Sequence, residues 1–292
     1  MTTDLTRPAV GTSTRTRLRT EGLQVGYGEK LVVGAASPED GKQGLDLDVV
    51  EGTVTAVIGP NGCGKSTLLR AMARLLAPRH GHVLLDGERI DRMPSKQVAT
   101  VLGVLPQDPV APEGLVVADL VARGRHPHQR WFRQWSPDDE AVVAEALAWT
   151  GTSEFADRPL ETLSGGQRQR VWISMALAQG TDVLLLDEPT TFLDLAHQVD
   201  VLDLVERLHR ERGRTVVMVL HDLNLAARYA DRLVAMRDGR IACSGAPADV
   251  LTEQTMRDVF GLEAKVVEDP VSGTPLVLPI GRRHRGRDDS DS

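Results

Sequence analysis

Near position 60 the chain reads Gly59-Pro60-Asn61-Gly62-Cys63-Gly64-Lys65-Ser66-Thr67, which fits the pattern G-x-x-x-x-G-K-[ST]. Glycines let such a loop curl until consecutive backbone N–H groups point at phosphate oxygens. A helix that starts near Lys65 adds the positive end of its dipole. Lys65 then supplies a mobile charge for the β- and γ-phosphates, and the Ser66 hydroxyl is placed to bind Mg²⁺. We therefore expect all nine residues to bind a nucleotide, rather than to form a glycine-rich turn with an incidental lysine.

The segments around this loop alternate between strand and helix patterns. A short β-branched run, residues 53–58, precedes the loop, and apolar residues at helical spacing follow it over 68–76. Further on, residues 183–186 and 215–220 are continuous apolar runs typical of strands buried on both faces, with a helical pattern between them. This alternation predicts an α/β fold with a parallel sheet.

A second motif, Val-Leu-Leu-Leu-Asp-Glu, ends in two adjacent carboxylates, Asp187 and Glu188. They come at the carboxyl end of an apolar strand, where ligands of open α/β sheets bind. Asp187 is expected to hold Mg²⁺, and Glu188 is placed to polarise a water molecule as general base. Two acids after a strand more often begin a helix, but the phosphate loop earlier in the chain favours the catalytic interpretation.

A third motif covers residues 163–170 and reads Leu-Ser-Gly-Gly-Gln-Arg-Gln-Arg. It resembles the signature sequence of ABC-type ATPases. Ser164, Gly165, Gly166 and Gln167 lie at the start of a predicted helix and would form another anion-binding site. On their own, these residues could equally form a helix cap followed by an arginine-rich face.

The resemblance extends to four single residues. It implies that Tyr27 stacks on adenine, and that Gln107 contacts Mg²⁺ and senses a membrane partner. It also implies that Asp194 communicates across a dimer. His221 would contact the γ-phosphate and orient Glu188 and the water, although a lone histidine after a strand is usually structural.

The family fold implied is a P-loop NTPase with a RecA-like parallel sheet core, an N-terminal antiparallel β subdomain and an inserted α-helical subdomain. We place the ATPase domain at residues 18–280, with the helical subdomain at about 108–180. Residues 1–17 and 281–292 are expected to be disordered tails because they can bury little apolar surface. The segment 31–52 is longer and more acidic than the short strand pair usual in the family.

A finer resemblance is to the ATPases of bacterial importers for ferric siderophores, haem and cobalamin. It rests on residues 124–128, 171–179, 189–197, 221–231 and 250–261. An ABC ATPase for another substrate, imported or exported, is one alternative. A soluble nucleotide switch in translation or DNA repair is another, but such proteins usually have two cassettes or a long coiled coil. His126 and His128 lack two further metal ligands, so we interpret them as part of a permease-contacting loop or a plain surface loop.

Composition bounds the partners of the 292-residue chain. Its 34 basic and 41 acidic residues give a net charge of −7, which disfavours a general nucleic-acid surface. The sequence contains no uncharged run of the roughly 18–20 residues that a membrane helix needs. Two cysteines suit a reducing compartment. Cys63, beside Lys65 and near a helix N-terminus, is expected to have a stabilised, reactive thiolate, or else to be a small residue that merely fits the loop.

One phosphate loop and one signature per chain imply, by the resemblance, a dimer that encloses two ATP molecules with Mg²⁺. The second ATPase subunit would be an identical chain. Transmembrane permease subunits would be direct partners, and a substrate-binding protein an indirect one. The expected location is peripheral, at the cytoplasmic face of the cell membrane.

Overall fold

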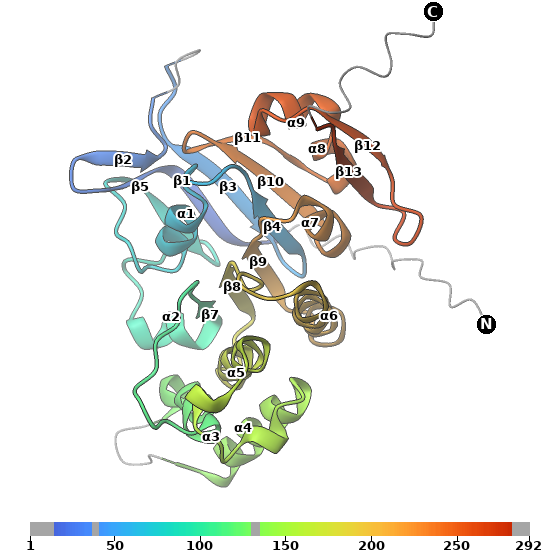
Figure 1. The fold of residues 1–292 in the computed structure, drawn as a ribbon. Helices are drawn as coiled ribbons and strands as arrows, with labels where there is room; N and C mark the ends of the chain where they lie inside the picture. The colour runs from blue at the N-terminus through green and yellow to red at the C-terminus, as the bar shows by residue number, and fades with distance from the viewer. Residues whose placement is uncertain (1–14, 37–40, 130–134, 282–292) are drawn as a thin grey trace, which may run out of the picture.

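The strand that leads into the phosphate loop, β4 (Val54–Ile58), lies inside a six-stranded sheet. The computed structural model describes residues 15–36, 41–129 and 135–281. Within them the sheet has the order β11-β10-β4-β9-β8-β7 (Figure 1). Its other strands are β7 (Leu102–Leu105), β8 (Val183–Asp187), β9 (Thr215–Val219), β10 (Arg232–Arg237) and β11 (Arg240–Gly245). All neighbours pair in parallel except β10 and β11.

Three central strands have a continuous apolar sequence and are buried on both faces. Every residue of β4, β8 and β9 is buried. Side chains on one face join a core with the helices α6 (Leu195–Arg212) and α7 (Leu223–Tyr229), and those on the other face join a core with α1 (Lys65–Met72). The expected parallel sheet is therefore confirmed, and its carboxyl ends meet at one edge.

A second, antiparallel sheet covers α1. It contains β1 (Thr16–Tyr27), β2 (Lys30–Val33), β3 (Leu45–Val50), β5 (His80–Leu85) and β6 (Glu88–Arg89). Its strand β3 alternates buried Leu with exposed Asp, as one-sided burial requires. The apolar residues at helical spacing predict a helix that continues to residue 76, but the observed helix is shorter. The helix ends at Met72 because Arg74 adopts a positive φ of 59° and Leu75 is exposed.

A helical layer occupies the range assigned to the helical subdomain. Its longer members are α3 (Val117–Arg123), α4 (Pro137–Trp149) and α5 (Gly165–Ala178), with 3-10 turns η1 (His126–His128), η2 (Ser153–Phe155) and η3 (Leu160–Thr162) between them. The helix α2 (Ser95–Val101) precedes β7. Because α5 packs against both α3 and α4 and contacts β7, it joins this layer to the central sheet.

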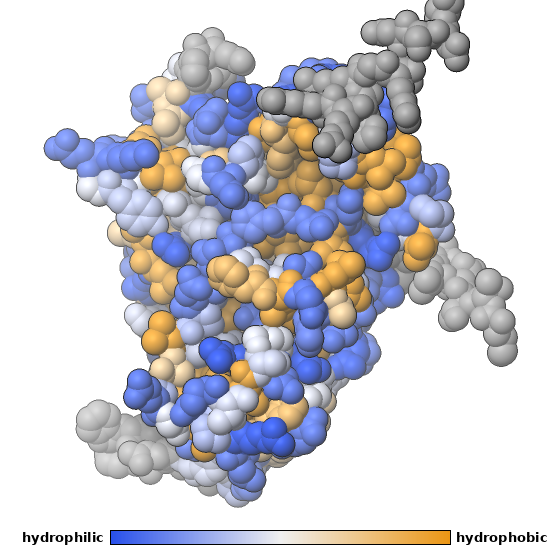
Figure 2. Space-filling view, in the orientation of Figure 1, coloured by the Kyte–Doolittle hydropathy of each residue, from blue (hydrophilic) through white to orange (hydrophobic). Residues whose placement is uncertain are grey.

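The chain after β11 forms a small C-terminal unit beside α7 (Figure 1). It consists of α8 (Pro247–Val250), α9 (Glu253–Phe260) and a hairpin of β12 (Ala264–Glu268) and β13 (Pro275–Pro279). In the part of the chain that the structure describes, every helix is too short or too polar to cross a bilayer. Hydrophilic side chains interrupt the hydrophobic ones across the face drawn in Figure 2.

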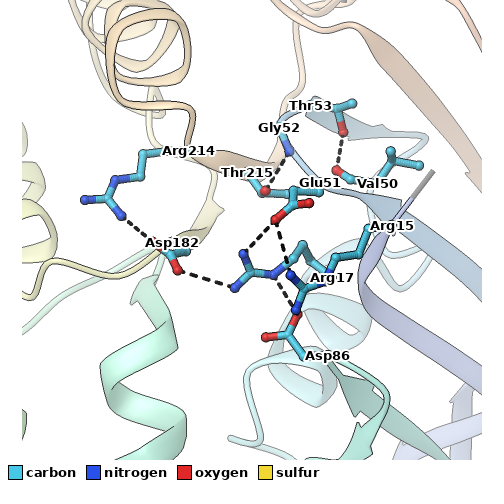
Figure 3. A network of polar contacts seen from close by, with 10 residues as sticks. All are labelled: Arg15, Arg17, Val50, Glu51, Gly52, Thr53, Asp86, Asp182, Arg214 and Thr215. Atoms are coloured by element: carbon cyan, nitrogen blue, oxygen red, sulfur yellow. Dashed lines mark hydrogen bonds and ion pairs between the residues drawn. The ribbon is translucent and has the colours of Figure 1, made fainter. Parts of the chain in front are cut away.

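The N-terminal boundary needs a correction. The sequence predicts a disordered tail up to residue 17, but β1 already begins at Thr16, and Arg17 is buried. The Arg17 guanidinium lies 2.7 Å from Asp86, 3.2 Å from Glu51 and 3.5 Å from Asp182 (Figure 3). These carboxylates compensate the desolvated cation, which the local sequence alone does not reveal. Of the predicted tails, residues 1–14 and 282–292 lie outside the described residues.

Candidate functional site

The carboxyl ends of β4, β8 and β9 open into a cavity of about 500 Å³. Six residues of the phosphate loop line it, together with Gln107, Glu188 and His221. These residues are far apart in sequence, and the parallel sheet brings them together because each follows a strand. Val32 of β2 also lines the cavity and was not predicted. The sequence gives no signal that a single valine in a short strand lines a cavity.

Local backbone geometry explains the glycines of the phosphate loop. Gly64 is the N-cap of α1 with a φ of 105°, in the region that favours glycine. Gly59 has a φ of 151°, and a Cβ atom there would lie 2.2 Å from the carbonyl oxygen of Met236. The Nζ atom of Lys65 donates to the carbonyl oxygens of Gly59 and Pro60, at 2.9 and 3.0 Å. The loop therefore holds the ammonium group inside its own curve, beside the cavity.

Asp187 has the properties of a cation ligand. Its side chain is buried, and within the described chain neither carboxylate oxygen has a hydrogen-bond partner. Burial raises the pKa of Asp187, while the nearby Ser66 hydroxyl and the charges of Arg70 and Lys65 act in the opposite direction. Buried oxygens without partners fit a hard cation such as Mg²⁺. The described residues hold no group of three or more His, Cys, Asp or Glu that could bind a metal alone, so such an ion would share its coordination with phosphate and water.

Glu188 is held by three side chains. Its Oε1 atom lies 2.7 Å from Nε2 of His221, and Oε2 accepts from Nε2 of Gln107 at 2.7 Å and from Oγ1 of Thr191 at 3.0 Å. Glu188 itself has a positive φ of 53°. Residues with such a strained backbone are found more often at functional sites than elsewhere. Sequence reasoning missed Thr191. The only available signal was its position three residues after Glu188.

The signature residues Ser164, Gly165, Gly166 and Gln167 lie away from the cavity lining. They form the first turn of α5, where the Ser164 and Gln167 side chains each accept from the other's backbone N–H in a capping box. Asp194 caps α6 in a similar way. The structure therefore does not bring the signature to the phosphate loop of the same chain.

Tyr27 and the two loop histidines also lie outside the cavity lining. Tyr27 is half exposed at the end of β1, and its hydroxyl accepts a hydrogen bond from Arg70 at 3.4 Å. His128 contacts the carbonyl oxygen of Gln179 at 2.7 Å, which fastens the turn η1 to the end of α5.

Cys63 differs from expectation. It is 6% exposed, and burial raises the pKa of its thiol, although Lys65 and backbone N–H groups partly offset the effect. The expected stabilised thiolate is therefore wrong, because desolvation outweighs the neighbouring charge. The interpretation as a small residue that fits the loop agrees with this burial.

We predict that maleimide labels Cys243, which is partly exposed, several-fold faster than Cys63 in the nucleotide-free protein. Mass spectrometry of the labelled peptides over time measures both rates. Mg-ATP should slow the residual labelling of Cys63 and leave that of Cys243 unchanged. Faster labelling of Cys63 than of Cys243 would show that the loop is more open than described.

A parallel sheet with a phosphate loop after β4 and a carboxylate pair at the end of β8 defines a P-loop NTPase. The chain belongs to the ABC transporter family, whose model matches residues 42–191. It is 52% identical over 270 residues to the petrobactin import ATP-binding protein FpuD of Bacillus anthracis, covering 92% of this chain and 96% of that protein. It is 50% identical over 266 residues to the ferric enterobactin transport ATP-binding protein FepC of Escherichia coli (strain K12), covering 91% and 95%.

A solved structure supports the same assignment. The dimeric bacterial ABC transporter cassette MJ0796 matches with a TM-score of 0.67 and 26% identity, covering 78% of this chain and 98% of the cassette. The expected fold and family resemblance are thus confirmed.

Proposed function

We propose that this protein is the ATP-hydrolysing subunit of a membrane importer for ferric siderophores or related iron chelates. The observation that carries the ATPase part is the position of Glu188, which contacts His221 and Gln107 and lines the same cavity as the phosphate loop. The substrate class is supported by two siderophore-import relatives at 50% identity or above over more than 90% of the chain. An importer for haem, cobalamin or another metal, or an exporter, is the alternative.

In this proposal the phosphate loop binds the ATP phosphates through its backbone N–H groups and Lys65. Val32 lines the cavity beside the loop, and Tyr27, which lies outside the lining in this structure, would stack on the adenine. Ser66, Gln107 and Asp187 hold Mg²⁺, which when bound offsets the negative charge of the phosphates.

Glu188 is the proposed general base, and it takes a proton from the attacking water. In the present structure both of its oxygens are occupied, Oε1 by His221 and Oε2 by Gln107 and Thr191. Oε2 already has two partners, whereas Oε1 has only His221 and keeps a second lone pair that can accept from a water molecule. His221 then remains as the group that orients the carboxylate and the γ-phosphate.

A second copy of the chain would complete each ATP site. The signature residues lie outside the cavity of their own chain, whereas their capped helix N-terminus is an anion-binding feature. Near it, Phe192 and Leu195 are 89% and 67% exposed, although both are large and apolar. Burying such residues in a homodimer, with Asp194 near the contact, would agree with the dimeric state of the matched cassette.

The protein would act at the cytoplasmic face of the cell membrane, bound to permease subunits. Gln107 lies near the start of the segment between β7 and α3, so a permease that moves this segment could release Glu188. A substrate-binding protein would deliver the iron chelate to the permease without touching this chain. No role for nucleic acid is proposed, because the net charge is −7.

The test is uptake of iron-labelled ferric siderophore by cells that lack the gene for this chain. We expect uptake to return with the wild-type gene and not with Glu188→Gln, and permease subunits to co-purify with the wild-type protein from membranes. Full uptake in the deletion strain across catecholate, hydroxamate and carboxylate siderophores, with loss of haem or cobalamin uptake instead, would contradict the substrate class.

A further inference from the structure

The first turn of α6 carries His197, the last residue of the segment 189–197, to which the family resemblance assigns no role. His197 is 40% exposed at its side chain, and its Nδ1 atom lies 2.6 Å from Oδ1 of Asp194. The backbone N–H of His197 donates to the same oxygen at 3.0 Å. These two contacts lower the pKa of Asp194. The imidazole therefore adds a second restraint to the Asp194 carboxylate, which already caps the helix through the backbone bond.

The same imidazole covers the signature helix. A Cβ atom built on Gly166 would lie 2.5 Å from Cδ2 and 2.9 Å from Cγ of His197. Gly166 is helical and has no positive φ, so its backbone conformation does not require glycine. Close approach of the His197 ring is what excludes a side chain here. The ring thus contacts the second glycine of the signature directly.

The loop between Glu188 and α6 completes a continuous chain of contacts. Thr191 donates to the Glu188 carboxylate, and Gln198 donates to the carbonyl oxygens of Thr190 and Leu193, at 3.4 and 3.0 Å. The side chain of Leu193 also lies against Gly165. The loop, the His197 ring and Gly166 therefore lie in one continuous series of contacts, along which a shift of the loop can reach the signature helix.

We propose that His197 is a positioning residue that couples the Asp194 loop to the signature helix of the same chain. The inference rests on the proposed function, in which Glu188 serves one ATP site of the dimer and the signature serves the other. His197 then transmits the state of the first site to the second within one subunit. His197 is not among the residues that line the chain's own cavity, so we expect its effect in turnover and in dimer closure rather than in nucleotide binding to that cavity.

Two substitutions separate the two contacts. His197→Phe keeps a ring over Gly166 and loses the bond to Asp194, and His197→Asn keeps a donor for Asp194 and loses the ring. We expect each to lower kcat for ATP hydrolysis by at least about threefold, an effect typical of residues that couple two sites. The Kd for ATP should change by less than about twofold. Introduced into Glu188→Gln protein, each should reduce the ATP-dependent dimer seen by size-exclusion chromatography. His80→Asn, at an exposed position of β5, is the matched control.

The outcomes are distinct. A wild-type kcat in both His197 variants would overturn the coupling role. A loss of ATP affinity as large as the loss of kcat would also overturn it, because that result indicates damage to the chain's own cavity. A defect in only one variant would show that a single contact suffices and would overturn the proposed two-sided link. If the wild-type chain itself hydrolyses no ATP, the proposed function fails, and the inference fails with it.

Discussion

Glu188→Gln protein is expected to bind ATP normally and to lose hydrolysis by at least about a hundredfold, the usual contribution of a general base. The substitution keeps the shape of the side chain and one acceptor oxygen. Contacts with Gln107 and Thr191, now at 2.7 and 3.0 Å, can therefore persist. Only the negative charge and the proton-accepting oxygen facing His221 are lost. Because hydrolysis opens the proposed dimer, the variant should also accumulate as an ATP-bound dimer.

Phosphate release, calorimetry and size-exclusion chromatography measure the three effects separately. Glu268→Gln is a matched control, since it makes the same chemical change in β12, away from the cavity. Turnover near the wild-type rate would remove Glu188 from the general-base role. Loss of ATP binding together with turnover would instead indicate that the carboxylate holds the phosphate loop in shape.

Much of the fold was predictable from the sequence because its signals are local. The strands β4, β8 and β9 are continuous apolar runs since both of their faces are buried, and such runs are visible in any window of five residues. The phosphate loop was equally plain, because its glycines are required by backbone geometry at Gly59 and Gly64. Each of these features depends on neighbours in the chain.

Features that depend on contacts between distant segments could not be predicted. Arg17 lies in a threonine- and arginine-rich stretch, and its burial follows only from Asp86 and Glu51, which are far away in sequence. Cys63 has cationic neighbours in the sequence, but its pKa is decided by burial under the rest of the fold. Thr191 lies close to Glu188 in the chain, and the residue pattern predicts neither their hydrogen bond nor the positive φ of Glu188.

Lys65→Ala protein should bind ATP at least about tenfold more weakly, a loss of about 1.4 kcal/mol or more. Lys65 is 5% exposed, and its ammonium group is held beside the cavity by the carbonyl oxygens of Gly59 and Pro60. A charge that is already oriented in this way needs little reorganisation when phosphate binds. Its removal should therefore weaken ATP binding by nearly the full value of the contact. Alanine also leaves the two carbonyl oxygens without their donor.

Calorimetric titration of ATP into both proteins measures the change in Kd. Lys265→Ala removes an equally long cation from an exposed place on β12 and should leave the affinity unchanged. Thermal unfolding without nucleotide separates loss of the phosphate contact from loss of the loop. Because Lys65 itself lines the cavity, water can enter the space left by its side chain and solvate the two freed carbonyl oxygens. We therefore expect a small change in Tm and a large change in Kd. Unchanged affinity in folded Lys65→Ala protein would contradict the assignment of this loop as the phosphate-binding element.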